Sequence, residues 1–390
     1  MVPADYTIRV ARSFEEARCF GAAWQQMAWH PDADRDFFAT VLRVRSQVVR
    51  PHLIVLERAG TPQAMLLARV EDGPLVTKIG YQTIFRPRVR SMFVVYGGVM
   101  GDASDLHAEL LVAELRSALK RGEADVAVLS RLRIDSPICR AARTQPAPLC
   151  RSRAVMPELH WRLHLPETMA EFLRSRSRNT RENVQRYSRR LVERYADRLT
   201  VREFRDVHEL DELLGVVEAV ARKTYQRGLG VGFGDTAEHR QLWQLALERG
   251  WLRVHALFLD GKPAAFWPGY AYHGSFFIGI PGYDPAYGEL RVGQFLQMKM
   301  IEALCRDPAI EFVDYGFGDA QYKRSFATES WEEADVLFFA PTLRAVSVNL
   351  TRSTIRGVIG LGKRLLDKGQ LSAKLKKLWR KRLSGAPKDG

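Results

Sequence analysis

Residues 251–284, WLRVHALFLDGKPAAFWPGYAYHGSFFIGIPGYD, carry three apolar strand patterns one after another. Asp260-Gly261 and His273-Gly274 separate the patterns, and both pairs end in the glycine that tight hairpin turns favour. The stretch therefore predicts an antiparallel meander, and this meander decides the fold class of the second half of the chain.

The segments around the meander alternate between helix and strand. A helical pattern follows it at 291–305, RVGQFLQMKMIEALC, and strand patterns come next at 310–317 and 333–341. Amphipathic helical patterns precede it at 208–228 and 238–250. Helices that mix with hairpins, rather than alternating strictly with parallel strands, indicate an α+β domain.

The first 150 residues repeat this coarse order. An apolar hairpin at 52–73 is followed by a strand pattern at 91–100, a helical pattern at 105–122 and another strand pattern at 124–132. A chain of 390 residues also exceeds what one core usually supports. We therefore predict an N-terminal domain over 1–155, a second domain over 156–342 and a tail over 343–390.

Composition excludes several classes of protein. The four cysteines, at 19, 139, 150 and 305, lie far apart and form no Cys-x-x-Cys pair, so neither disulfides nor a metal is expected. The first twenty residues lack the apolar run of a signal peptide, and no stretch has the length of a membrane-spanning helix. The expected location is the cytoplasm, or its membrane face.

The net charge of +14 is concentrated at the end of the chain. From Thr351 onward, twelve Lys and Arg residues stand against two Asp. Within this tail an apolar stripe runs between the basic residues, at Leu371, Leu375, Leu378, Trp379 and Leu383. Such a pattern is typical of an amphipathic helix on an anionic membrane surface, although a loose solubilising tail and an RNA-binding tail remain alternatives.

Two segments of the second domain carry residues suited to chemistry. In DYGFGDAQYKRSFAT, residues 314–328, Gly316 and Gly318 leave room for a ligand beside the backbone, and Asp314 could orient or deprotonate an attacking group. In YGELRVGQF, residues 287–295, a helix N-terminus could hold a phosphate. Both segments also fit ordinary structural roles, with Asp314 as a turn cap and Trp267 as a core residue.

The order of these segments resembles the acyltransferase fold of the GNAT superfamily. GYDPAYGELRVGQFLQMKMIEAL at 282–304 followed by FVDYGFGDAQYKRSFAT at 312–328 is similar to the BioF2-like or CelD/BcsL acetyltransferase family, which is related to the FemAB aminoacyltransferases. The resemblance covers residues 160–340. It implies two tandem GNAT-like domains followed by a basic helical tail, with the working site in the second domain.

The resemblance also implies an activity. The expected reaction moves an acyl group, with acetyl-CoA as donor, to an amine or hydroxyl of a sugar, polysaccharide precursor or lipid-linked intermediate of the bacterial envelope. The implied coenzyme A contacts are Gly288, Arg291, Val292, Gly293 and Gln294. The implied catalytic residues are Asp314, Tyr322 and Lys323. The implied substrate contacts are Tyr283, Asp284, Trp267 and Gly318.

Two other functions remain open at this point. A FemAB-type enzyme would take aminoacyl-tRNA as donor and a cell-wall precursor as acceptor, which is the case in which a nucleic acid would be a partner. The arginine-rich helical pattern at 169–198 would suit an anionic substrate, a nucleic acid or a solvated surface. A non-catalytic pair of domains that scaffolds a synthase at the membrane is the third reading.

Overall fold

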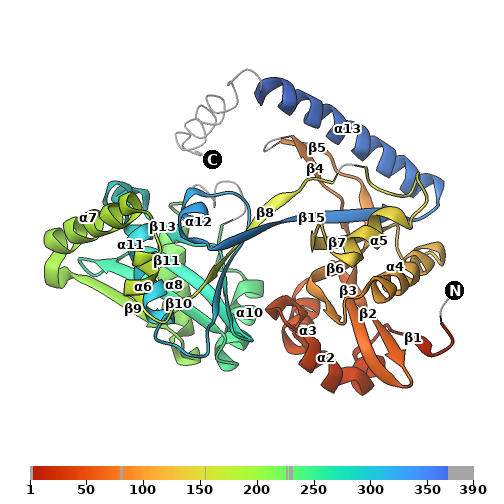
Figure 1. Ribbon diagram of the computed structural model, residues 1–390, viewed down its shortest axis with the longest axis horizontal. Helices are drawn as coiled ribbons and strands as arrows, with labels where there is room; N and C mark the ends of the chain where they lie inside the picture. Colours follow the sequence, from red (N-terminus) through yellow and green to blue (C-terminus); the bar gives the residue numbers. More distant parts are fainter. Residues whose placement is uncertain (1–2, 80–81, 154, 225–226, 228–231, 368–390) are drawn as a thin grey trace. The chain divides into compact units, whose positions relative to one another are not determined.

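The structure is a computed structural model that describes residues 3–79, 82–153, 155–224, 227 and 232–367. Its contacts divide the chain into two units (Figure 1). Unit 1 holds residues up to Pro157 and those from Glu332 onward, and unit 2 holds Glu158–Trp331. The sequence analysis had placed the boundaries after residues 155 and 342.

Unit 1 is a twisted sheet in the order β1-β2-β3-β6-β7-β15. All its neighbouring strands with a resolved register are antiparallel except β6 and β7, which run parallel because helix α4 crosses between them. Its strands are β1 (Tyr6–Ala11), β2 (Val48–Arg58), β3 (Thr61–Pro74), β6 (Arg88–Gly101), β7 (Val126–Arg133) and β15 (Glu329–Phe339), with a separate hairpin of β4 (Thr77–Ile79) and β5 (Gln82–Phe85).

Helices cover both faces of the unit 1 sheet. Apolar side chains of α4 and α5 pack with one face, and those of α1, α2 and α3 pack with the other. These helices are α1 (Phe14–Ala17), α2 (Gly21–Met27), α3 (Arg35–Val44), α4 (Asp105–Lys120) and α5 (Pro137–Thr144). The unit is therefore a three-layer sandwich with two apolar cores.

The C-terminal residues that the structure describes belong to unit 1. Helix α13 (Leu343–Asp367) follows β15 and packs on the unit through Ala345 and Val348. Asn349 donates from Nδ2 to the carbonyl oxygens of Leu149 at 2.9 Å and Arg151 at 3.0 Å. The amphipathic stripe predicted between residues 371 and 383 lies outside the described residues. Among the described helices, none combines the length and the apolar character needed to cross a membrane.

Unit 2 repeats the plan. Its sheet runs β8-β14-β12-β11-β10-β9, and a two-residue strand, β13, also pairs with β11. The predicted meander is confirmed as β10, β11 and β12, joined by turns at Asp260-Gly261 and His273-Gly274. The strands are β8 (Glu158–His164), β9 (Leu199–Phe204), β10 (Leu252–Leu259), β11 (Lys262–Tyr272), β12 (Ser275–Ile278), β13 (Gly282–Tyr283) and β14 (Phe312–Phe317).

Helices again cover both faces of the unit 2 sheet. Helices α6, α7, α11 and α12 share one apolar core with the sheet, and α8 and α10 share the other. Their bounds are α6 (Met169–Arg174), α7 (Arg178–Tyr195), α8 (Leu210–Ala221), α10 (Ala237–Glu248), α11 (Val292–Leu304) and α12 (Gln321–Phe326). The arginine-rich pattern predicted as one long helix is thus two helices, separated where Ser177 caps the second.

The close packing of β11 on β12 gives the first prediction. A Cβ on Gly269 would lie 2.3 Å from the Phe276 ring, which is fully buried, so Gly269→Ala should destabilise unit 2 by about 1–3 kcal/mol. The matched control is Gly215→Ala on the exposed side of α8, where nothing lies within 4 Å of the new Cβ. That change should stabilise by roughly 0.5–1 kcal/mol, because Ala favours the helix. Urea unfolding of both variants measures the difference, and equal midpoints would contradict the assigned packing.

Candidate active site

The two parallel strands of unit 2 separate at their carboxyl ends. β12 and β14 pair only from Ser275 and Phe312 to Phe277 and Asp314. Beyond this point the chain of β12 turns away to β13, which pairs with β11, while β14 continues along β8. A site at such a divergence has backbone groups on both sides that the sheet itself does not use.

The N-terminus of α11 lies at this edge. It follows the 3₁₀ helix η5 (Pro285–Leu290), and Arg291 joins the two in a left-handed conformation with φ of 56°. Helix α11 has no side-chain cap and no acidic residue in its first turn. Its first amides and the positive end of its dipole therefore favour an anion.

The residues predicted to contact coenzyme A differ in burial and in their neighbours within this loop. The Val292 side chain is fully buried in the core, whereas Gln294 is partly exposed and its backbone N–H donates to the Arg291 carbonyl. Added Cβ atoms on Gly288 and Gly293 would lie 3.6 and 3.4 Å from the Tyr283 ring. The structure thus brings Tyr283 against both glycines.

Asp284 stabilises the loop ahead of α11 through hydrogen bonds. It is buried and accepts hydrogen bonds from Lys223 Nζ at 2.5 Å and from the amide of Ala286 at 3.0 Å. The second of these bonds caps η5. These contacts give Asp284 a structural role in shaping the loop ahead of α11, beside its predicted role in substrate binding.

A row of aromatic side chains connects this loop to the β14 side. Trp267 donates from Nε1 to the Gly293 carbonyl at 2.9 Å, and its ring meets Tyr322 edge-on at a centroid distance of 5.4 Å. Tyr322 in turn contacts Tyr315 at 5.9 Å. Tyr315 is buried, and its hydroxyl accepts from Gln297 Nε2 at 3.4 Å. Burial raises the pKa of Tyr315, so its hydroxyl stays protonated.

Asp314 and Lys323 hold the same glycine. Asp314 Oδ1 accepts from the amide of Gly316 at 2.8 Å, and Lys323 Nζ donates to the carbonyl oxygens of Gly316 at 3.2 Å and Phe317 at 2.6 Å. Lys323 is 7% exposed. Gly316 and Gly318 have φ of 67° and 90°, a conformation that strains other residues. The structure therefore uses both charges to shape the loop after β14.

His160 and Trp331 complete this arrangement, and the sequence analysis missed both. His160 is buried, with Nε2 2.8 Å from Asp314 Oδ1, and its ring stacks on Trp331 at a centroid distance of 4.5 Å. His160 lies on β8 and Asp314 on β14, which are 154 residues apart along the chain. The sequence around His160 gave no signal for this pairing.

Arg176 is another site residue that the sequence analysis did not single out. Its Nη1 donates to the carbonyl oxygens of Phe326 at 3.0 Å and Ala327 at 3.2 Å, where α12 ends. A cation there complements the negative end of the helix. Burial lowers the pKa of the Arg176 guanidinium, which still remains charged at neutral pH.

The corresponding crossover helix of unit 1 has a capped and acidic N-terminus. Helix α4 crosses between parallel strands as α11 does, but its N-terminus is capped by Ser104 and carries Asp105 in the first turn. Asp102 lies beside it, with Oδ2 3.1 Å from His107 Nδ1. Acidic groups at this end of a helix occupy the amides that an anion would bind, or repel the anion itself. Of the two crossover helices, α11 is the one suited to a phosphate.

Comparison with known proteins agrees with this geometry. Residues 178–324 match the family described as acetyltransferase (GNAT) domain. The crystal structure of FemX superposes with a TM-score of 0.57 at 10% identity, covering 83% of this chain and 95% of that one. The chain therefore has a mixed α+β fold of two units, each a sheet covered by helices, and residues 178–324 in unit 2 match an acyltransferase domain of GNAT type.

Two further structures show weaker similarity. A tandem GNAT protein from the clavulanic acid biosynthesis pathway has a TM-score of 0.48 at 12% identity, over 86% of this chain and 99% of that one. The structure of L-PGS from Bacillus licheniformis has a TM-score of 0.47 at 12% identity, over 90% and 98%. No curated protein matches the chain significantly.

The buried position of Lys323 gives the second prediction. Lys323→Met removes the donor from two loop carbonyls and should lower the free energy of unfolding by about 1.5–3 kcal/mol. The adjacent Arg324→Met is the control, because Arg324 is exposed and pairs with the exposed Asp319 at 2.9 Å, which is worth under about 1 kcal/mol. Chemical denaturation compares the two. A Lys323 variant as stable as the Arg324 variant would contradict the structural role.

Proposed function

We propose that unit 2 transfers an acyl group, with acetyl-CoA as donor, to an amine or hydroxyl of a sugar, polysaccharide precursor or lipid-linked intermediate, as in the BioF2-like or CelD/BcsL family. The observation that carries the proposal is the uncapped, acid-free N-terminus of α11 at the divergence of β12 and β14. The pyrophosphate of the donor would bind the amides of the first turn, next to Gly288 and Gly293. Arg291 would add a charged donor at the same place.

The thioester end would then lie along the aromatic row. Trp267 and Tyr322 contact each other edge-on and join α11 to α12 through the Gly293 carbonyl. An acyl chain on this row meets apolar ring surface, which suits a small acyl group. The tether from the pyrophosphate to the thioester would therefore follow residues that already contact one another.

The chemical step is direct transfer. The acceptor nitrogen or oxygen attacks the thioester carbonyl, its bond to the carbonyl carbon forms, and the bond from that carbon to sulfur breaks. Tyr322 would donate its phenolic proton to the leaving thiolate, and the proton of the acceptor would pass to water. No cysteine or serine nucleophile of the chain takes part.

Asp314 and Lys323 would act by position rather than by proton transfer. Both side chains already bind the peptide groups of Gly316, and Asp314 also binds His160. They would hold the loop that faces the acyl group, so that its remaining backbone groups lie in fixed places when the carbonyl becomes negatively charged. We propose this positioning role for both residues, in place of the role of base that the sequence suggested for Asp314.

One specific observation favours an alternative acyl donor in place of acetyl-CoA. Four exposed arginines of α7 lie on one face of the helix and make no ion pair among the described residues, namely Arg186, Arg189, Arg190 and Arg194. Helix α7 packs against η5 and α11, so these arginines lie on a helix beside the N-terminus of α11. A polyanion longer than coenzyme A, such as aminoacyl-tRNA, could extend from the loop over this surface.

The third prediction separates the donors. Calorimetry should show saturable acetyl-CoA binding that Arg291→Gln weakens at least about tenfold, because a charge-assisted hydrogen bond is lost. Arg306→Gln is the control at the other end of α11, where the Arg306 side chain pairs with Glu302 at 2.7 Å. Absence of acetyl-CoA binding together with tight, salt-sensitive tRNA binding would replace the acyl-CoA proposal with the aminoacyl one.

The fourth prediction concerns Tyr322. Tyr322→Phe keeps the ring beside Trp267 and removes only the hydroxyl, so kcat should fall by about 10²-fold or more with acetyl-CoA affinity unchanged. Release of the coenzyme A thiol in the presence of a panel of amino sugars would measure it. Tyr315→Phe is the matched control, because the Tyr315 hydroxyl binds Gln297 in the core. An unchanged kcat in the Tyr322 variant would remove Tyr322 from the chemical step.

A further inference from the structure

A polar pocket of unit 1 lies where β3 ends and β6 begins. Its volume is about 690 Å³, which is in the range of pockets that hold small molecules. Of its lining residues, all but Gly73 and Pro74 carry polar side chains. The pocket belongs to unit 1, whereas the proposed donor site belongs to unit 2. It is therefore a candidate site for a second ligand.

Hydrogen bonds to the main chain fix the frame of this pocket. Pro74 and Arg88 are register partners of β3 and β6, and the amide of Leu75 donates to the Pro87 carbonyl at 2.8 Å. From helix α13, Arg344 Nη2 donates to the Arg88 carbonyl at 2.9 Å. The backbone ahead of β6 is thus held by two neighbouring segments, β3 and α13.

Arg86 and Arg88 are the open cations of the pocket. Both line it and are exposed, and neither guanidinium group makes a hydrogen bond or an ion pair among the described residues. Pro87 stands between them, and a residue before proline favours an extended backbone. Side chains two positions apart in an extended chain lie on the same side, which accounts for both arginines lining one pocket.

The two carboxylates of the pocket are bound by other arginines. Asp72 accepts from Arg90 through both oxygens, at 2.8 Å from Nε and 2.9 Å from Nη2. Glu71 Oε2 accepts from Arg69 Nε at 2.8 Å. The hydrogen bonds from Arg90, and to a smaller extent the charge of Arg88, lower the pKa of Asp72, so this carboxylate stays ionised. With Arg86, four arginines stand against two carboxylates, which leaves an excess of positive charge.

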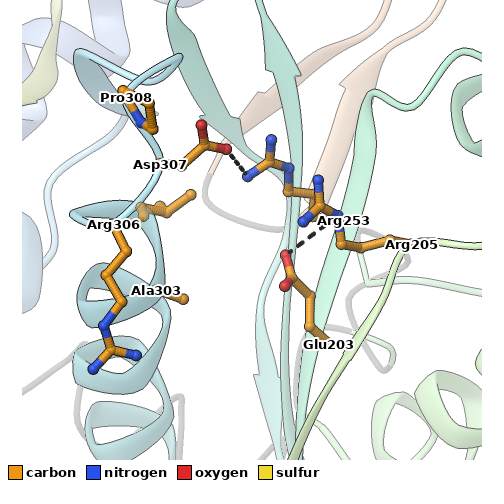
Figure 2. A pocket seen from close by; sticks show the side chains of 8 residues that line it. Glu203, Arg205, Arg253, Ala303, Arg306, Asp307 and Pro308 are labelled. Carbon is orange, nitrogen blue, oxygen red and sulfur yellow. Dashed lines mark ion pairs between the residues drawn. The ribbon is translucent and has the colours of Figure 1, made fainter.

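A smaller polar pocket of unit 2 differs in this respect (Figure 2). Its volume is about 260 Å³, and Arg253 Nη1 there lies 2.6 Å from Asp307 Oδ2. Arg205 Nε lies 3.9 Å from Glu203 Oε1. Figure 2 shows that each of these two arginines faces a carboxylate of the same pocket. We assign no ligand to this pocket, and it provides a control for the removal of an arginine.

The available groups of the unit 1 pocket define the chemistry of a ligand. Two neighbouring guanidinium groups match the oxygen atoms and the negative charge of a phosphate monoester. Glu71 is partly exposed, and its Oε1 makes no hydrogen bond among the described residues, so it can accept from a hydroxyl group. The lining has no aromatic side chain on which a nucleobase could stack, and Pro74 alone offers apolar side-chain surface to a lipid.

We infer that this pocket binds a sugar phosphate, with the phosphate between Arg86 and Arg88 and a sugar hydroxyl on Glu71. The hydroxyl of Ser91 and the amide of Gln47 belong to lining residues and add neutral hydrogen-bonding groups for the sugar. A volume of about 690 Å³ exceeds the size of a phosphate ion and leaves room for the sugar. The inference concerns unit 1 only and does not depend on the donor proposed for unit 2.

The fifth prediction tests this pocket by calorimetry on the full chain, with glucose 6-phosphate, glucosamine 6-phosphate and ribose 5-phosphate as probes. At least one probe should bind saturably, and more tightly than inorganic phosphate or glucose. Arg86→Gln and Arg88→Gln should each weaken this binding at least about tenfold, because a charge-assisted hydrogen bond is lost. Arg205→Gln, in the pocket of unit 2, is the control and should bind as the wild type does.

Three outcomes would overturn the inference. The N-terminus of α11 is a competing place for a phosphate, so the titration is repeated with Arg291→Gln, and binding that is lost there but retained in Arg86→Gln and Arg88→Gln excludes the unit 1 pocket. The absence of saturable binding of every sugar phosphate overturns the inference, as does binding no tighter than that of inorganic phosphate. Circular dichroism of each variant verifies that the chain is folded. None of these outcomes decides the acetyl-CoA proposal, which is tested separately at α11.

Discussion

The short parallel pairing of β12 with β14 is the constraint on which the rest of unit 2 depends. Parallel neighbours require a crossover, and α11 provides it, so the N-terminus of this helix lies at the carboxyl ends of both strands. The pairing stops at Phe277 and Asp314. Because β13 then follows β11 and β14 follows β8, backbone groups become available at the one edge where the helix dipole is positive.

The charged side chains of the candidate site mainly bind and stabilise backbone groups, and they are little exposed to solvent. Lys323, Asp314 and Arg176 each bind main-chain groups between Gly316, near the end of β14, and Ala327, ahead of β15. A loop with two glycines at positive φ would otherwise have many accessible conformations. Fixing it from both sides restricts these conformations at the cost of desolvating the charges, and this preorganised backbone is what our acyl-transfer proposal requires.

The crossover helices of the two units begin with opposite electrostatic character. Both have a helix that crosses between parallel strands, yet α4 begins with Ser104 and Asp105 while α11 begins with Arg291 and Val292. The first arrangement has a side-chain cap and an acidic first turn, whereas the second has no side-chain cap and no acidic residue there. This difference supports our proposal that unit 2 takes the anionic donor.

The sequence by itself determined the class of fold and predicted the segments of the candidate site, because strand alternation, turn glycines and helix periodicity are local patterns. It identified the meander, the helix at 291–305 and the loop after Asp314. Only the tertiary structure decided that β15 completes unit 1, that His160 binds Asp314 and that Lys323 faces inward onto two carbonyl groups. Strand pairing and the burial of a charge depend on residues far apart along the chain, so no window of sequence contains them.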